Sequence, residues 1–175
     1  MLEKGLVQVY TGKGKGKTTA SLGLAFRAAG QGLNVLMLQF LKADKIGGEH
    51  KAAKILPNIS IEQYGAKQFY KEKEEVKKIH REKALEGLER AREAVLGEEY
   101  DMVILDEINV ALDYDLIPVG EVLKLIEEKP PQVELVLTGR NAPPEITDQA
   151  HLVSEIAMVK HPFSQGIKAR KGIEY

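Results

Sequence analysis

The chain has 175 residues and a mass of 19.4 kDa, which is the size of one ordinary domain. Its hydrophobic fraction of 43% and charged fraction of 29% exclude a disordered or collagen-like chain, because such chains lack the apolar residues of a packed core. A net charge of -1 gives no general attraction to nucleic acid or anionic membrane, and the absence of cysteine excludes disulfides and thiolate metal sites.

Short apolar runs rich in Val, Ile and Leu recur along the chain and predict strands. They lie at residues 6–10, 35–40, 59–63, 102–105, 133–137 and 152–159. Helical patterns separate them at residues 18–29, which Gly30 is placed to end, at 72–96 and at 119–128. Continuous apolar strands alternating with helices indicate a mostly parallel sheet covered on both faces. The expected fold is a three-layer α/β domain over residues 1–175.

The long helical pattern at residues 72–96 is amphipathic. Its apolar residues recur at three- and four-residue spacings or their sums, at Val76, Ile79, Leu85, Leu88 and Val95. Lys and Glu fill the other face, which we interpret as a solvated surface and not as an interaction site. We expect His80 on this polar side.

Residues 11–19 read Thr-Gly-Lys-Gly-Lys-Gly-Lys-Thr-Thr between the first strand and the first helix, the context of a phosphate-binding loop. Glycines let successive N–H groups point at phosphate oxygens, and the helix N-terminus adds positive charge. Lys17 would contact the terminal phosphates, and the Thr18 hydroxyl would bind Mg²⁺. Thr11 stands where glycine is usual, so Gly12 is expected to make the turn. The expected phosphate contacts are Gly12, Lys13, Gly14, Lys15, Gly16, Lys17, Thr18 and Thr19. The loop predicts a P-loop NTPase-like (RecA-like) domain.

Two alternatives apply to this loop. It is also compatible with a basic glycine-rich turn that holds no ligand. Lys13 and Lys15 would otherwise form a nucleic-acid patch, which the near-neutral charge of the chain disfavours.

The strand expected near residues 102–105 is followed by Asp106 and Glu107. At the carboxyl edge of a parallel sheet these carboxylates would face the phosphate loop. Asp106 would hold Mg²⁺ directly or through water, and Glu107 would either polarise a water molecule or complete the metal shell. The sequence therefore predicts a site for ATP and magnesium.

Further motifs lie outside these two elements. They occupy residues 38–42, 48–49, 105–109, 137–144 and 159–175. Together with the loop, and in the same order over nearly the whole chain, they resemble the ATP:corrinoid adenosyltransferases of the cobalamin pathway (the CobA/CobO/BtuR type). The Thr-Gly-Arg-x-Ala-Pro-Pro element and the His-Pro-Phe…Gly-Ile-Lys-Ala…Lys-Gly-Ile-Glu ending are far more specific than the loop.

The resemblance implies transfer of the 5′-deoxyadenosyl group of ATP to the Co(I) of a reduced corrinoid, with release of triphosphate, in adenosylcobalamin biosynthesis or salvage. In that reaction Lys17, Thr18 and Mg²⁺ would stabilise the leaving triphosphate. Glu107 is then better interpreted as a metal ligand or its neighbour than as a water activator. Arg140 would reach the triphosphate from the sheet edge; its alternative role is a surface ion pair.

Apolar walls must hold the corrin and keep water off cobalt. The candidates are Phe40, Tyr64, Phe69, Tyr70 and Phe163, each with core packing as the alternative. Many members of the family carry a Phe-Thr-Trp element after the third strand. Here residues 66–70 read Ala-Lys-Gln-Phe-Tyr, and the chain has no tryptophan.

The expected partners follow from the same interpretation. They are ATP, the corrinoid and a separate reductant of the flavoprotein class, with no nucleic acid and no membrane. Family members are often homodimers, and no export signal precedes the first strand, so we expect a cytoplasmic homodimer. A small-molecule P-loop kinase or ATP hydrolase is the main alternative, and a non-catalytic nucleotide-dependent binder or sensor is the second.

Overall fold

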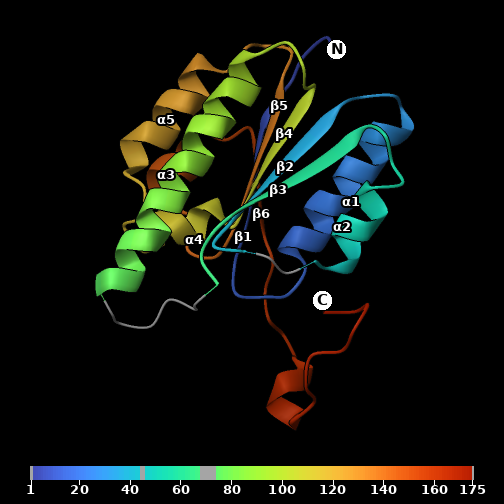
Figure 1. Ribbon diagram of the computed structural model, residues 1–175, viewed down its shortest axis with the longest axis vertical. Coiled ribbons are helices and arrows are strands. Elements are labelled where there is room, and N and C mark those ends of the chain that lie inside the picture. The colour runs from blue at the N-terminus through green and yellow to red at the C-terminus, as the bar shows by residue number, and fades with distance from the viewer. Residues whose placement is uncertain (1, 44–45, 68–73, 175) are drawn as a thin grey trace.

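The computed structural model describes residues 2–43, 46–67 and 74–174, and its centre is one six-stranded sheet (Figure 1). The strands are β1 (Val7–Thr11), β2 (Val35–Phe40), β3 (Ile59–Tyr64), β4 (Met102–Asp106), β5 (Glu134–Thr138) and β6 (Leu152–Glu155). Their order is β3-β2-β4-β5-β1-β6, and every neighbouring pair is parallel. The predicted parallel sheet is confirmed, and β5 separates the strand before the phosphate loop from the strand that ends at Asp106.

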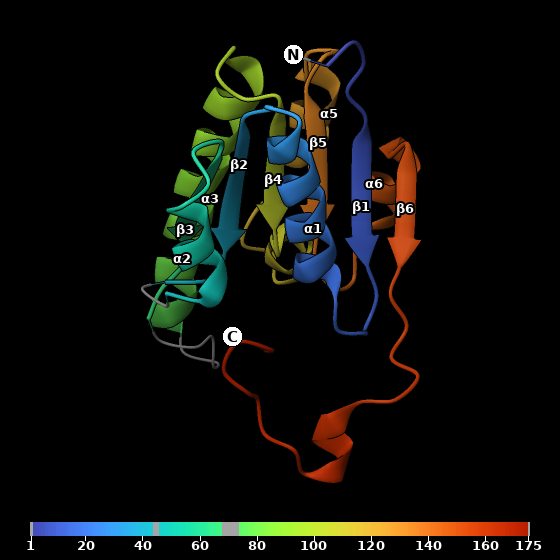
Figure 2. The same cartoon turned by 90° about the vertical axis from the view of Figure 1, so that its right-hand side faces the viewer.

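Helices cover both faces of the sheet, as the two views show (Figures 1 and 2). One face carries α1 (Lys17–Gly30) and α2 (Gly48–Ala53). The other carries α3 (Glu74–Leu96), α4 (Ile108–Asp113), α5 (Val119–Glu128) and α6 (Pro144–Gln149), and a 3₁₀ turn, η1 (Pro162–Gln165), follows β6. This is the expected three-layer architecture. Within the described ranges, no helix is long and apolar enough to cross a membrane.

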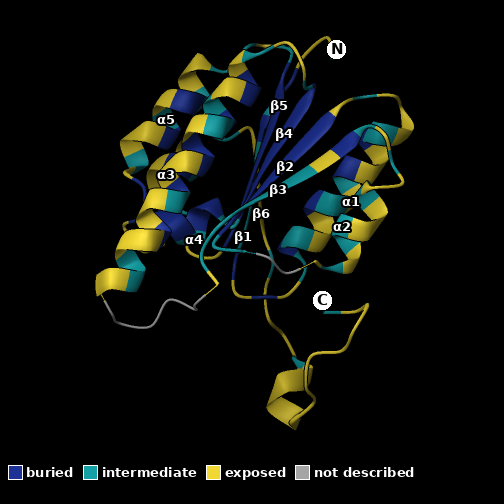
Figure 3. Ribbon diagram, in the orientation of Figure 1, coloured by how far each residue is buried: buried dark blue, intermediate teal, exposed yellow. Residues whose placement is uncertain are grey.

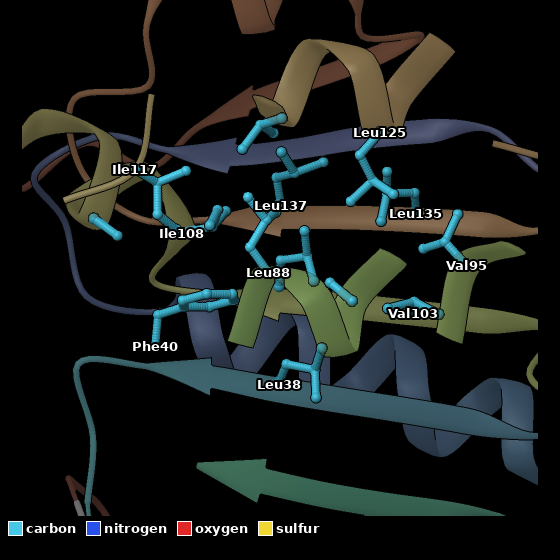
Figure 4. Packing of buried hydrophobic residues seen from close by; sticks show 14 of the residues in the cluster. Leu38, Phe40, Leu88, Val95, Val103, Ile108, Ile117, Leu125, Leu135 and Leu137 are labelled. Atoms are coloured by element: carbon cyan, nitrogen blue, oxygen red, sulfur yellow. The ribbon is translucent and has the colours of Figure 1, made fainter. Parts of the chain in front are cut away.

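The central strands are apolar along their length because both of their faces are covered. Every residue of β2, β4 and β5 is buried (Figure 3). Leucine and valine side chains of these strands pack against α3 and α5, and Figure 4 shows Phe40 and Leu38 of β2 beside Leu88 of α3. This core holds the strand ends in fixed positions at one edge of the sheet.

The buried face of α3 agrees with the predicted one only in part: Leu88 and Val95 are buried as expected. Ile79 and Leu85 are 45% and 40% exposed, and His80 is 2% exposed, so its expected place on the polar side is wrong. Apart from His80, the rest of the buried stripe consists of small residues, namely Ala84, Gly87, Ala91 and Ala94. At Gly87, an added Cβ atom would lie 2.8 Å from the Tyr64 ring and 3.0 Å from the Phe40 ring. The helix therefore packs against the sheet through small side chains, which an apolar-residue pattern does not detect.

Candidate active site

The phosphate loop turns through two glycines in conformations that L side chains rarely adopt. Gly12 has φ +96° and Gly16 has φ +130°, which confirms that Gly12 makes the turn next to Thr11. The loop also packs closely on the segment after β6. Gly14 donates its N–H to the Ile156 carbonyl at 2.7 Å, and a Cβ atom at Gly14 would lie 2.6 Å from the Ala157 carbonyl oxygen.

Lys17 folds back into this loop and is 6% exposed. Its Nζ donates to the carbonyl oxygens of Gly12 and Gly14, each at 2.8 Å. Burial lowers the pKa of this ammonium, and the positive charge of Arg140 lowers it too, whereas Glu107 and Asp106 act in the opposite direction. The loop therefore holds a buried ammonium group whose hydrogen-bond partners are neutral carbonyl oxygens. An anion that entered the loop would be a stronger partner for it.

Asp106, at the end of β4, is fully buried, and four side chains donate to its carboxylate. The hydroxyls of Thr18 and Thr138 each donate to Oδ1 at 2.8 Å. Lys42 Nζ donates to Oδ2 at 2.9 Å, and Gln39 Nε2 at 3.3 Å. The adjacent ends of β2, β4 and β5, together with the first turn of α1, thus meet at one carboxylate, as the parallel sheet requires.

Glu107 follows directly and takes a left-handed conformation with φ +64°. Its backbone N–H donates to Thr138 Oγ1 at 3.0 Å, which fixes the turn into α4. Burial, followed by the charge of Asp106, raises the pKa of the Glu107 carboxyl, while Lys42, Lys17 and Arg140 oppose that rise. The free protein therefore disfavours the Glu107 carboxylate, and an added cation would favour it.

Thr11, which stands where glycine is usual in such loops, makes a contact that glycine could not make. Its Oγ1 accepts the Ala142 N–H at 3.2 Å, so it fastens the loop after β5 to the phosphate loop. Gly139, before Arg140, has φ +134°, and a Cβ atom there would lie 2.9 Å from Asn109 Cβ. Arg140 itself is exposed at the mouth of the site.

The phosphate loop from Gly14 to Thr19, together with Lys42, Glu107 and Arg140, borders one cleft of about 690 Å³. Four cationic side chains line it, at Lys15, Lys17, Lys42 and Arg140. Three carboxylates also line it, at Glu49, Glu107 and Glu174, and apolar side chains such as Leu22, Phe26 and Leu56 complete the lining. The four cations suit an anionic ligand, and the apolar side chains suit an apolar group bound beside it. Lys13 is exposed beside the loop and does not line the cleft.

The oxygen atoms gathered near the end of β4 are of the type that binds magnesium. The Thr18 hydroxyl and the two carboxylates offer the hard oxygens that Mg²⁺ prefers, and Thr18 already contacts Asp106. Among the described residues, no group of three or more His, Cys, Asp or Glu side chains is arranged to hold a metal ion. A metal here therefore needs further oxygens from a nucleotide or from water.

The three aromatic candidates within the described residues lie in different surroundings. Phe40 is fully buried against α3, so it does not line the cleft, and core packing explains it (Figure 4). Tyr64 is half-buried, and its hydroxyl donates to Glu62. Phe163 is 80% exposed on η1. Phe69 and Tyr70 lie outside the described residues.

Three contributors to the Asp106 cluster were not among the predicted site residues: Gln39, Lys42 and Thr138. Each lies at or just after the end of a strand that the sequence pattern already located. The available signal was therefore a polar residue at the carboxyl end of a parallel strand, next to the strand of the acidic motif.

Comparison with known proteins extends this picture beyond the loop. Residues 3–175 match the family described as ATP:corrinoid adenosyltransferase BtuR/CobO/CobP. The chain is similar to a corrinoid adenosyltransferase of Sinorhizobium sp, with 42% identity over 99% of this chain and 81% of that protein. It is also 35% identical to the corrinoid adenosyltransferase of Escherichia coli (strain K12) and 36% identical to corrinoid adenosyltransferase CobA of Salmonella typhimurium (strain LT2), in each case over 99% of this chain and 87% of the relative.

Proposed function

The chain belongs to the ATP:corrinoid adenosyltransferase family, and from that membership we propose how its own residues carry out the transfer of the 5′-deoxyadenosyl group from ATP to the Co(I) of a reduced corrinoid. In this reaction the cobalt electron pair forms a bond to C5′ of the ribose. The C5′–O bond breaks, and its electron pair leaves with triphosphate. The observation that carries the proposal is one cleft lined by the phosphate loop and Arg140 and by Thr18 and Lys42, which both contact Asp106.

Catalysis on the leaving-group side is electrostatic. The amides of residues 15–18 and the Lys17 ammonium would bind the triphosphate, and Lys17 would exchange the carbonyls of Gly12 and Gly14 for phosphate oxygens. Arg140, on the cleft wall, would neutralise part of the remaining charge, and so would Lys15 on release from its 2.9 Å ion pair with Glu174. Because negative charge grows on the triphosphate as C5′–O breaks, these contacts strengthen toward the transition state.

We propose that Thr18, Asp106 and Glu107 hold Mg²⁺ together with nucleotide oxygens. The bound ion would supply Lewis-acid stabilisation of the triphosphate charge. The raised pKa of Glu107 supports this assignment, because a carboxylate that is disfavoured in the free protein gains a partner when a cation arrives.

The nucleophile carries no proton, so the reaction needs no general base. Rate on this side would come from holding cobalt near C5′, in line with the bond that breaks. Phe163 is the exposed aromatic of the specific C-terminal motif among the described residues, and we propose it as an apolar contact of the corrin.

Four wider assignments complete the proposal. Residues 1–175 would act as one ATP-binding adenosyltransferase domain, which the single continuous sheet supports. The enzyme would work as a homodimer, which the exposed apolar side chains of the C-terminal segment support, Val159 being 95% exposed. It would act in the cytoplasm, where ATP is available. A separate flavoprotein would reduce the corrinoid cobalt to Co(I), because the chain has no cysteine for thiol redox chemistry.

The test is an anaerobic visible spectrum of chemically reduced cob(I)alamin mixed with the protein and MgATP, read together with phosphorus NMR. We expect a light-sensitive alkyl-cobalt spectrum and an equal amount of triphosphate. ADP and phosphate as the main products would instead indicate a kinase or hydrolase and would refute the proposed use of the cleft.

A further inference from the structure

Lys42 provides the one contact to Asp106 from a cationic side chain among the hydrogen bonds described above. Its Nζ lies 2.9 Å from Oδ2, whereas Thr18, Thr138 and Gln39 donate from neutral groups. The Asp106 side chain is 0% exposed, and the Lys42 side chain is 33% exposed and lines the cleft. This ion pair thus reaches from the protein interior to the wall where the triphosphate would lie.

The backbone places Lys42 there in an unusual way. The preceding residue, Leu41, has φ +60°, and its N–H donates to the Tyr64 carbonyl at 2.9 Å. Gly65 lies so close that an added Cβ atom would be 2.5 Å from Leu41 C and 2.5 Å from Lys42 N. A left-handed leucine and a glycine contact together hold the chain in a turn that directs Lys42 back to the end of β4.

The charges explain why a cation is needed at this point. A fully buried carboxylate is costly unless a positive charge compensates it, and neutral donors compensate it only in part. When Mg²⁺ and a triphosphate enter the cleft, the ion provides that compensation, and two cations at one carboxylate repel each other. The flexible four-carbon side chain of lysine can then carry its ammonium to a phosphate oxygen without backbone movement.

We propose that Lys42 is a positioning residue that compensates Asp106 before the metal–nucleotide complex arrives and then moves to the triphosphate. This inference rests on the proposed function, since it assumes that the metal and the triphosphate bind at the Asp106 cluster. It predicts effects of opposite sign on two binding affinities. Lys42 competes with a metal ion that binds alone, and it assists ATP that binds without metal.

The experiment compares wild-type protein with Lys42→Met in two binding measurements that use no corrinoid. Mn²⁺ alone is titrated by electron paramagnetic resonance, and ATP in the presence of a chelator is titrated by calorimetry. We expect the variant to bind Mn²⁺ about tenfold more tightly and metal-free ATP about tenfold more weakly, the size of one charged hydrogen bond in each case. Lys42→Arg keeps the charge and should restore metal-free ATP binding to within about threefold of wild type.

Lys54→Met is the matched control, because Lys54 is an exposed lysine at the end of α2, and we expect both affinities to stay unchanged. If Lys42→Met does not fold, as judged by thermal unfolding, Lys42→Gln replaces it and keeps an N–H donor for Oδ2. Unchanged affinities, or a loss in both measurements, would overturn the proposal, since a purely structural lysine does not move them in opposite directions. Failure of the wild-type protein to alkylate cob(I)alamin would count against the proposed function and leave this binding test intact.

Discussion

The carboxyl edge of the sheet and the C-terminal segment, residues 156–174, both carry family-specific motifs, but the chain holds them in different ways. At the sheet edge, Gln39, Asp106 and Thr138 are fully buried and bonded to one another through the Asp106 carboxylate. The C-terminal segment is largely exposed and extends beyond the sheet (Figures 2 and 3).

The contacts of the C-terminal segment are mostly local. Arg170 donates to Glu174, and His161 Nδ1 accepts the Phe163 N–H. The segment meets the phosphate loop where Gly14 donates to Ile156 and where Lys15 pairs with Glu174 at 2.9 Å. The fold thus preorganises the leaving-group side of the reaction. On the corrin side, we propose that the contacts come from the substrate or from a second copy of the chain.

Replacing one phenylalanine in each region gives the sharpest form of this comparison. Phe40→Ala removes a fully buried ring and should lower the free energy of unfolding by about 3–5 kcal/mol. Phe163→Ala removes an exposed ring and should change it by less than about 0.5 kcal/mol, while raising the KM for corrinoid roughly tenfold. Chemical denaturation and steady-state kinetics measure both. A large loss of stability in Phe163→Ala would contradict the contrast between the regions.

Lys17→Ala tests the preorganised side itself. The variant loses the buried cation of the phosphate loop and should transfer adenosyl groups about 10²–10³-fold more slowly, the usual effect of removing one preorganised charge contact. Its melting temperature should stay close to that of wild type, because the lost hydrogen bonds are offset by the removal of a desolvated charge. Lys54→Ala serves as the exposed control. Unchanged turnover in Lys17→Ala would mean that the triphosphate binds elsewhere.

Asp106→Asn affects both the stability and the metal site of the sheet edge. The amide cannot accept from Thr18, Thr138, Gln39 and Lys42 together, and it leaves the Lys42 ammonium without its carboxylate. We expect the free energy of unfolding to fall by about 3 kcal/mol and the half-saturating Mg²⁺ concentration for adenosyl transfer to rise. An unaltered magnesium titration would remove Asp106 from the metal shell.

Glu107→Gln should give the smallest effect and one of opposite sign. Because the pKa of the Glu107 carboxyl is raised above its ordinary value of 4.5, the folded state holds this proton more tightly than the unfolded state. Above that raised pKa the carboxylate therefore reduces stability, and below pH 4.5 it makes no difference. We expect the glutamine variant to gain about 0.5–1 kcal/mol at neutral pH, a gain that disappears on acidification. Thermal unfolding over a pH series measures it, and a gain that is independent of pH would refute the electrostatic cause.

The comparison also shows what the sequence could predict. Short apolar runs located each strand to within a few residues. The continuously apolar runs of β2, β4 and β5 reflect burial on both faces of the sheet. On α3 the apolar periodicity located the buried Leu88 and Val95 but missed the small residues and His80 that are buried with them, and Ile79 and Leu85 are exposed. Hydrophobicity alone does not encode how closely a helix can approach a sheet, which here depends on glycine and alanine.

The phosphate loop and the acidic strand end could be identified from residue types at fixed short spacings, and the family from motifs in the same order over nearly the whole chain. Only the tertiary structure brought Lys42, Gln39 and Thr138 to Asp106, from elements separated by 32 to 67 positions along the chain. It also showed that Phe40, an expected corrin contact, lies in the core and that Thr11 accepts a hydrogen bond from Ala142. These outcomes depend on strand order, on which face of a strand each residue occupies and on close packing, and none of these is a local property of the sequence.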